Sequence, residues 1–277
     1  MKYEQLLYEE KGNVVWITLN RPKVLNALSM KLSDEIVYAI EEIRKSTAIK
    51  FLVIKGSGDN FSVGDDINEM MNWGNANDIT RRVRYYQNMA NQLEELDKIT
   101  IAAVDGFAVG GGLEITMACD FVIATERAKW GMPEVDVGIT PGWGGTTRLA
   151  RLIGRRRAKE INLIGALHSA KRAVEWNLWN RVVPNDQLDL EVEKLLEVLT
   201  SKNQQGMRQL KFIINRGVEC DLYTAQGFEV LSGALTGAVS GMWQIIDADK
   251  GAGIIGFSGK NELWNKRRNL AKNFWTD

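Results

Sequence analysis

Two patterns of hydrophobic residues alternate along the first two thirds of the chain. Short apolar runs, rich in β-branched and aromatic residues as buried strands are, lie at 13–19, 50–56, 100–106 and 119–125. At 29–46 and 78–98, apolar residues instead recur every three or four positions, the spacing of a helix with one buried face. Strands that alternate with helices predict an α/β domain with a largely parallel sheet.

The last third of the chain has a different pattern. From about Gln187 onward the spacing is helical throughout, and small residues gather at Ala225, Gly233, Ala234, Gly237 and Ala238. Small side chains let helices approach closely, either inside one subunit or between subunits. We therefore predict a core domain over 1–195 and a helical C-terminal region over 196–277 that does not fold alone.

Composition and charge indicate a globular protein and argue against a nucleic-acid-binding or membrane-spanning one. The 277 residues are 45% hydrophobic and 25% charged, enough apolar material for a sizeable core. Lys plus Arg equals Asp plus Glu, at 35 each, so the formal net charge is zero. A zero net charge argues against a large basic surface that binds nucleic acid. The most apolar stretch, 99–125, is interrupted by three acidic residues, so no membrane span is expected.

Cysteine and histidine are scarce. Two cysteines, Cys119 and Cys220, make no disulfide framework, and no secretory signal opens the chain, so a cytoplasmic location is expected. Any Ser-His-Asp triad or multi-histidine metal site would need the single histidine, His168. It precedes a predicted helix, where a surface or capping role is expected, and no metal site is predicted.

The most informative segment is AVGGGLEITMACD, at 108–120. Its three glycines end a strand and open a helix, whose first turn has free N–H groups and a positive dipole end. An oxygen that becomes negative during a reaction would be stabilised there. Glu114 follows Gly111 by three positions and lies on the same helix face. The alternative is a tight turn with a solvated glutamate.

Two further segments add acidic residues to this picture. In WGMPEVDVGITPGWGGTTRLAR, Pro133 fixes the backbone before Glu134, and one strand separates Glu134 from the glycine-rich helix. The chain is expected to return Glu134 to the side of Glu114, where two carboxylates around one water make an acid–base pair. In NFSVGDDINEM, Asp65 and Asp66 lie at another strand-to-helix turn, where helix capping is the plain alternative.

Four segments in this order resemble the successive signatures of the crotonase superfamily, also called the enoyl-CoA hydratase/isomerase family: RPKVLNAL, FSVGDDINEM, AAVDGFAVGGGLEITMACD and GMPEVDVGITPGWGGTTRLARLIG. The closing DKGAGIIGFSGK resembles that family's C-terminal segment. The resemblance implies a ClpP/crotonase-like spiral of ββα units in two nearly perpendicular sheets, with a helical C-terminal region that builds trimers, often paired into hexamers. It also implies an acyl-CoA thioester as ligand, with no permanently bound cofactor and no metal.

The resemblance assigns a role to each matching position. The main-chain N–H groups of Asp65 and Gly111 correspond to an oxyanion hole for the thioester carbonyl. Glu114 and Glu134 correspond to the two glutamates with which hydratases hold and activate water. The positions that correspond to the CoA-binding residues are Lys23, Val24, Leu25, Asp66, Ile67, Asn68 and Lys260.

The presence of both glutamates selects the expected reaction. Relatives that only shift a double bond typically lack one of them, and dienoyl isomerases have an aspartate where this chain has Pro141. The pair favours reversible syn hydration of a 2-enoyl-CoA to a 3-hydroxyacyl-CoA. Asp65, Trp143 and Thr147 depart from the residues usual in the family. Trp130 and Trp143 flank the acid loop, where they either narrow the acyl pocket or pack in the core.

Two alternatives stay open. One is another crotonase reaction on an acyl-CoA, such as double-bond isomerisation, C–C hydrolysis or decarboxylation. The other is an RNA-binding relative, suggested by three adjacent arginines in GRRRAKE (154–160) but disfavoured by the zero net charge. We expect an acyl-CoA enzyme, assembled as a homotrimer or hexamer, with no nucleic acid or membrane partner.

Overall fold

The computed structural model describes residues 2–239 and 262–275, and the chain divides into two units, Met1–Val192 and Glu193–Asp277. This division lies close to the predicted boundary at 195/196, and it stays a prediction that the helical C-terminal region does not fold alone. Each unit is described separately below.

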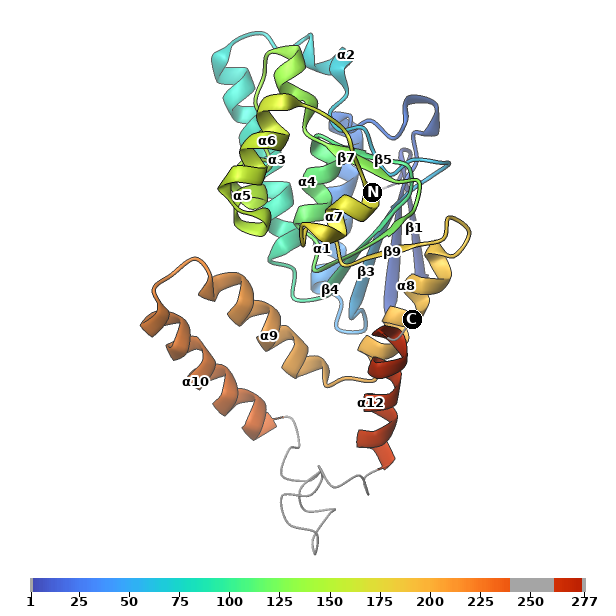
Figure 1. Cartoon of the computed structure of the whole chain (residues 1–277), viewed down its shortest axis with the longest axis vertical. Helices are drawn as coiled ribbons and strands as arrows, with labels where there is room; N and C mark the ends of the chain where they lie inside the picture. The colour runs from blue at the N-terminus through green and yellow to red at the C-terminus, as the bar shows by residue number, and fades with distance from the viewer. Residues whose placement is uncertain (1, 240–261, 276–277) are drawn as a thin grey trace, which may run out of the picture. The chain divides into compact units, whose positions relative to one another are not determined.

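A six-stranded sheet in the order β1-β2-β3-β4-β6-β9 organises the first unit (Figure 1). Its strands are β1 (Leu6–Lys11), β2 (Val14–Leu19), β3 (Phe51–Gly56), β4 (Ile99–Val104), β6 (Phe121–Thr125) and β9 (Arg181–Val183). Only β1 runs antiparallel to its neighbour within this sheet, which confirms the predicted α/β domain with a largely parallel sheet. The apolar pattern does not predict β1, because this edge strand has mostly exposed or half-exposed residues.

A second sheet of three short strands carries the site. It joins β5 (Phe107–Val109), β7 (Lys129–Gly131) and β8 (His168–Ser169). Strands of two or three residues hold too few positions to show a period, so the sequence pattern does not predict them. The two sheets agree in number with those that the family resemblance implies. Helix α4 (Gly111–Met117) begins directly after β5 and is buried along its whole length.

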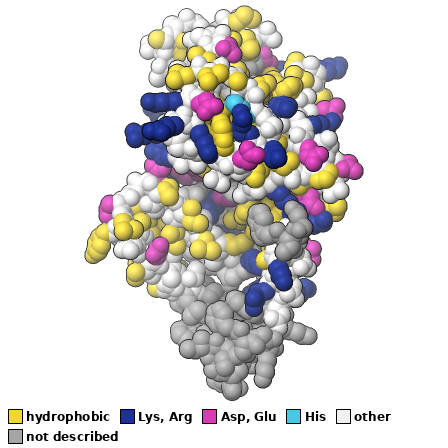
Figure 2. Space-filling model, in the orientation of Figure 1, with side chains coloured by type: hydrophobic (Ala, Val, Ile, Leu, Met, Phe, Trp, Pro, Cys, Tyr) yellow, Lys and Arg dark blue, Asp and Glu magenta, His cyan; other side chains and the backbone are white. Residues whose placement is uncertain are grey.

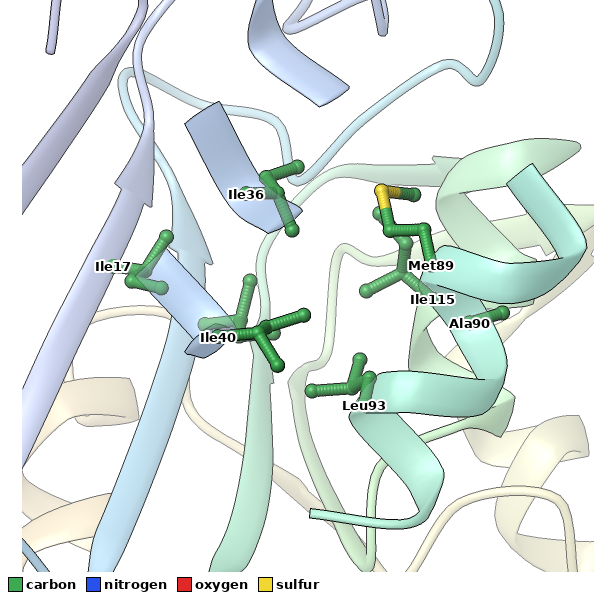
Figure 3. Close-up of a pocket in the computed structure, with 8 residues that line it drawn as sticks. Ile17, Ile36, Ile40, Met89, Ala90, Leu93 and Ile115 are labelled. Carbon is green, nitrogen blue, oxygen red and sulfur yellow. The ribbon is translucent and has the colours of Figure 1, made fainter. Parts of the chain in front are cut away.

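Helices α1 (Met30–Lys45), α3 (Ala76–Glu94) and α4 lie on one face of the large sheet (Figure 1). Figure 3 shows apolar side chains of α1, α3, α4 and the sheet pointing toward one another around a cavity of about 10 Å³. The residues that line it are Ile17, Ile36, Ile40, Ile54, Met89, Ala90, Leu93 and Ile115. A cavity this small and apolar is a packing gap in a dense core rather than a ligand site.

Short helices complete the first unit. They are η1 (Pro22–Val24), α2 (Ile67–Met70), η2 (Pro133–Val137), α5 (Thr147–Ile153), α6 (Arg155–Ile164) and α7 (Ala170–Glu175). The three arginines of GRRRAKE begin α6 and are exposed, and Arg157 lies over the ring of Trp176 at 4.9 Å. Basic and acidic side chains both occur on the face shown in Figure 2. His168 lies in β8, and Ser169 caps α7 by accepting from the N–H of Arg172.

The described residues of the C-terminal part are helical, as predicted from Gln187 onward. Its helices are α8 (Leu188–Thr200), which crosses the unit boundary, α9 (Gln204–Gly217), α10 (Leu222–Val239) and α12 (Glu262–Trp275). Rings of Phe212 and Phe228 hold α9 against α10, with centroids 5.5 Å apart. Large apolar side chains of this helix pair and of the loop between them remain exposed, at Leu210, Ile214, Val218, Leu222, Tyr223, Val230 and Leu231. Among the described helices, none is both long and apolar enough to cross a membrane.

Candidate active site

Glu114 is a buried carboxylate held by main-chain donors. It lies in the first turn of α4, with 1% of its surface exposed. Its Oε1 accepts hydrogen bonds from the N–H groups of Trp143 at 2.7 Å and Gly145 at 2.6 Å. A Cβ added to Gly145 would lie 3.0 Å from the same oxygen and closer still to Met132 and Pro141. Glycine at 145 therefore lets the loop approach the carboxylate.

The surroundings of Glu114 favour retention of its proton. Burial raises the pKa of the Glu114 carboxyl to about 7, and the two main-chain donors offset this effect only in part. The nearby Glu134 carboxyl raises the same pKa further. A carboxyl group that titrates near neutral pH is suited to general acid–base chemistry.

Glu134 approaches the start of the same helix from another loop. It is the second residue of η2, directly after Pro133. A Cβ added to Gly110 would meet Glu134 Oε1 at 3.0 Å, so this carboxyl lies beside the N-terminus of α4. Burial raises the pKa of Glu134, and its Oε2 is shielded from solvent without a hydrogen-bond partner within the described residues. The structure thus brings Glu134 back beside the glycine-rich helix.

The segments that carry Asp65 and Gly111 also come together here. Gly111 is the first residue of α4, so its N–H has no acceptor within the helix. The bridge between Leu28 and Asp65 uses the N–H groups of Leu28 and Asp66, which leaves that of Asp65 outside the pairing. A Cβ added to Gly64 would lie 2.8 Å from the nitrogen of Gly111, so the two segments are in close contact. Their role as an oxyanion hole stays a prediction.

The side chain of Asp65 adds a third carboxyl to the cluster. Burial raises the pKa of Asp65 well above its usual value, and the Glu114 and Glu134 carboxyls raise it further. Its Oδ1 is shielded from solvent and has no hydrogen-bond partner in the described part of the chain. Carboxyls that all resist ionisation favour at least one bound proton in this cluster at neutral pH.

A cavity of about 620 Å³ joins these groups, a volume within the range of small-molecule sites. The residues that line it are Asp65, Met70, Trp73, Ile79, Val83, Tyr86, Gln87, Glu114, Glu134, Gly138, Ile139, Thr140, Pro141, Gly142 and Trp143. Trp143 forms part of the wall, as predicted, and its ring stacks on that of Tyr86 with centroids 4.3 Å apart. The described residues contain no group of three or more acidic, His or Cys side chains arranged to hold a metal ion.

The prediction that Trp130 flanks the acyl pocket is wrong. Trp130 is fully buried in β7 and does not line the cavity. Its Nε1 donates to the carbonyl of Ser169 at 2.9 Å, and its ring contacts those of His168, Trp176 and Trp179. Pairing of β7 with β8 therefore directs this indole into the core, the second of the two positions that the sequence allowed.

The predicted CoA-binding turn lies beside the Asp65 segment. Lys23 and Val24 end η1, and Leu25 follows in a left-handed conformation at φ 52°. The carbonyl of Leu25 accepts from the N–H of Val63, and Asp66, which caps α2, pairs with Arg21 at 2.9 Å. Ile67 and Asn68 begin α2 and are exposed, whereas Lys260 lies outside the described residues.

Asn26 positions these loops and was not singled out in the sequence. It is fully buried at φ 56°, its Oδ1 accepts from the N–H of Arg21, and its Nδ2 donates to the carbonyls of Ser57 and Asn60. One side chain thus ties the η1 turn to the loop after β3. The asparagine of RPKVLNAL was a visible signal, but two of its partners, Ser57 and Asn60, lie more than thirty positions away.

The geometry is suited to acid–base chemistry, because two carboxyls with raised pKa lie beside the N-terminus of α4. A family model described as enoyl-CoA hydratase/isomerase matches residues 9–234. The chain belongs to this family, as its motifs indicated.

Two curated relatives and one solved structure are similar over most of their length. A short-chain-enoyl-CoA hydratase of Clostridium acetobutylicum is 38% identical, over 83% of this chain and 88% of that protein. A crotonyl-CoA hydratase of Syntrophomonas wolfei is 39% identical, with the same two coverages. The crystal structure of an enoyl-CoA hydratase from Bacillus anthracis has a TM-score of 0.80 and 33% identity, over 83% of this chain and 90% of that one.

Proposed function

We propose that the protein catalyses the reversible syn hydration of a 2-enoyl-CoA to a 3-hydroxyacyl-CoA. The observation that carries the proposal is the pair Glu114 and Glu134, two carboxyls with raised pKa that line one cavity at the start of α4. The hydratase names of the similar proteins support the same reaction.

In this proposal the thioester carbonyl accepts hydrogen bonds from the N–H groups of Asp65 and Gly111. Addition of water to C3 moves negative charge onto that oxygen, and preorganised donors stabilise the resulting enolate. Removing one such donor in other enzymes lowers the rate by about 10²–10³. CoA would lie along the η1 turn and the start of α2, next to Lys23, Val24, Leu25, Asp66, Ile67 and Asn68.

The two carboxyls take different roles. Glu114 activates the attacking water as general base, because two N–H groups stabilise its ionised form and fix its orientation. Glu134 donates the proton to C2, because its shielded Oε2 has no donor that would stabilise the anion. With both groups on one water molecule, the hydroxyl and the new hydrogen are added to the same face of the double bond.

A panel of thioesters tests the reaction. Loss of the conjugated absorbance of crotonyl-CoA, with a proton from solvent at C2, is the expected result, and it should persist after exhaustive chelation because we propose no metal. The same panel separates the alternatives: a shifted double bond indicates isomerisation, and free acid or carbon dioxide indicates hydrolysis or decarboxylation. A protein that hydrates none of the esters would contradict the proposal.

The pH dependence follows from the raised pKa of Glu114. The base must be ionised, so kcat/KM should fall about tenfold per pH unit below an apparent pKa near 7. The rate also requires a protonated Glu134, so the profile should be bell-shaped, with two limbs that belong to the pair rather than to either residue. Initial rates with crotonyl-CoA from pH 5 to 10 measure it. A flat profile between pH 5 and 7 would show that Glu114 is not the base.

We also propose a homotrimer or a hexamer in the cytoplasm. The exposed apolar side chains of α9 and α10 support burial of this helix pair against another subunit, because water contact disfavours a large apolar surface. Light scattering on the purified protein measures the assembly.

A further inference from the structure

The loop that carries both donors to Glu114 is itself bonded to Arg148. Arg148 is the second residue of α5, which begins shortly after this loop, and its Nη1 donates to the carbonyl of Trp143 at 2.6 Å. Its main-chain N–H donates to the carbonyl of Gly144, also at 2.6 Å. A Cβ added to Gly144 would lie 2.5 Å from Nη1, so glycine at this position lets the guanidinium approach the loop.

The last turn of α3 fixes the guanidinium of Arg148. Its Nε and Nη2 donate to Oε2 of Glu94 at 3.1 and 2.7 Å, and Nη2 also donates to Oδ1 of Asn91 at 2.6 Å. The side chain of Arg148 is 14% exposed, so this contact is largely shielded from water. Arginine can bond two elements at once because its planar fork presents five N–H donors, whereas lysine has one compact ammonium group. Arg148 therefore ties the 143–145 loop to α3.

The bonds of Arg148 fall on the peptide units that orient the donors to Glu114. The carbonyl of Trp143 belongs to the peptide unit that lies between the two donor units, so a bond to this oxygen fixes the middle of the loop. The carbonyl of Gly144 and the N–H of Gly145 belong to one planar unit, which accepts from Arg148 at one end and donates to Glu114 at the other. Hydrogen bonds in such a series strengthen one another.

Arg148 also supplies a positive charge near the carboxyl. Burial has the largest effect on Glu114 and raises its pKa, and the Glu134 carboxyl raises it further. The two main-chain donors lower this pKa, and so does the charge of Arg148. Asp65, on another segment, is a further acidic group that interacts with Glu114. Loss of the Arg148 side chain would remove a nearby cation and loosen the donor loop, and both changes favour the protonated form of Glu114.

We propose that Arg148 is a positioning residue that holds the 143–145 loop, and through the two N–H groups of this loop the Glu114 carboxylate, in the orientation that a general base needs. The inference rests on the proposed function for the role of Glu114 as base. Arg148 does not line the cavity, so it acts through the loop and touches no substrate. A purely structural role, in which Arg148 only joins α5 to α3, would stabilise the fold and leave the titration of Glu114 unchanged.

The titration of Glu114 tests the inference without requiring a reaction. Infrared spectra of the full chain at a series of pH values follow the carbonyl stretch of the protonated carboxyl, identified as the band that Glu114→Gln removes. Arg148→Met removes the charge and the donors at a similar side-chain length, and it should raise the midpoint of this titration by about one pH unit. An unchanged midpoint in the folded Arg148→Met protein would overturn the inference.

Arg151→Met is the matched control. Arg151 lies about one turn further along α5, is exposed, and donates from Nη1 to the carbonyl of Thr147 at 3.1 Å. The variant makes the same change of charge on the same helix, so the midpoint should stay at the wild-type value. A control that shifts as far as Arg148→Met would show that the charge of the helix, and not the contact with the loop, sets the titration.

The rate separates position from charge. Arg148→Lys keeps the positive charge but loses the fork, so it should shift the midpoint less than Arg148→Met does. It should still lower kcat for crotonyl-CoA at the optimal pH by about 10–10², with little change in KM, because the base is no longer held in place. A wild-type kcat in Arg148→Lys would contradict the positioning role, and this variant decides the question if Arg148→Met does not fold.

The two proposals fail separately. A protein that hydrates no enoyl ester, but in which Arg148→Met moves the titration of Glu114, keeps the role of Arg148 and loses the proposed reaction. A protein that hydrates crotonyl-CoA, but in which Arg148→Met leaves this titration unchanged, keeps the reaction and loses the inference.

Discussion

Replacing Glu114 by glutamine should lower kcat for hydration by about 10²–10⁴, with little change in the affinity for CoA esters. Glutamine keeps the size of the side chain and can still accept from the N–H groups of Trp143 and Gly145, but it cannot take a proton from water. Glu134→Gln should lower kcat by a similar factor, because it removes the donor to C2. Steady-state rates with crotonyl-CoA and calorimetry with hexanoyl-CoA measure the two quantities.

The double variant tests whether the pair acts as a unit. Its rate should be far higher than the product of the two single losses predicts, because either single change already prevents concerted addition. Glu126→Gln, on the exposed loop after β6, is the control and should keep the wild-type rate. If either active-site variant hydrates at the wild-type rate, the two-carboxylate mechanism is wrong and isomerisation or hydrolysis becomes the better proposal.

Gly64→Ala should lower kcat by about 10²–10³ by displacing the proposed oxyanion donors. The added Cβ would lie 2.8 Å from the nitrogen of Gly111 and 2.9 Å from the carbonyl oxygen of Val109, both of them main-chain atoms that cannot turn aside. The φ of 87° at this position adds strain for any side chain. Crotonyl-CoA rates on protein whose folding is checked by circular dichroism measure the effect.

Gly12→Ala separates strain from contact. Gly12 also has a positive φ, 64°, but an added Cβ would meet no atom within 4 Å. This control should lose some stability and keep its kcat. Equal rates for Gly64→Ala and the wild type would remove the Asp65 and Gly111 amides from the mechanism.

The sequence predicted the long elements well, because their apolar spacing reflects burial against one large core. The helix expected over 29–46 is α1, which begins after the capping Ser29 and ends at Lys45 before Ser46. The short strands β5, β7 and β8 depend on pairing with distant partners, and no local period can indicate them.

The candidate site was predictable where its main-chain geometry requires particular residues, such as glycine or proline. Glycines at 110–112 and Pro133 mark the turns that carry Glu114 and Glu134. The sequence does not indicate which way a side chain points relative to the sheet. For this reason the sequence analysis left two positions open for Trp130 and did not identify Trp73. Only the folded chain shows that Trp73 lines the cavity while Trp130 packs in the core.

The contact that holds Glu114 has a consequence for how the family can diversify. Both donors to Oε1 are main-chain N–H groups of one loop, so the carboxylate is anchored by atoms that every residue except proline possesses. The side chain at 143 faces the cavity and can change size without loss of this anchor. We therefore expect single substitutions at 143 to reshape the cavity while both N–H donors to Glu114 remain, whereas a Cβ at 145 would collide with Met132 and Pro141.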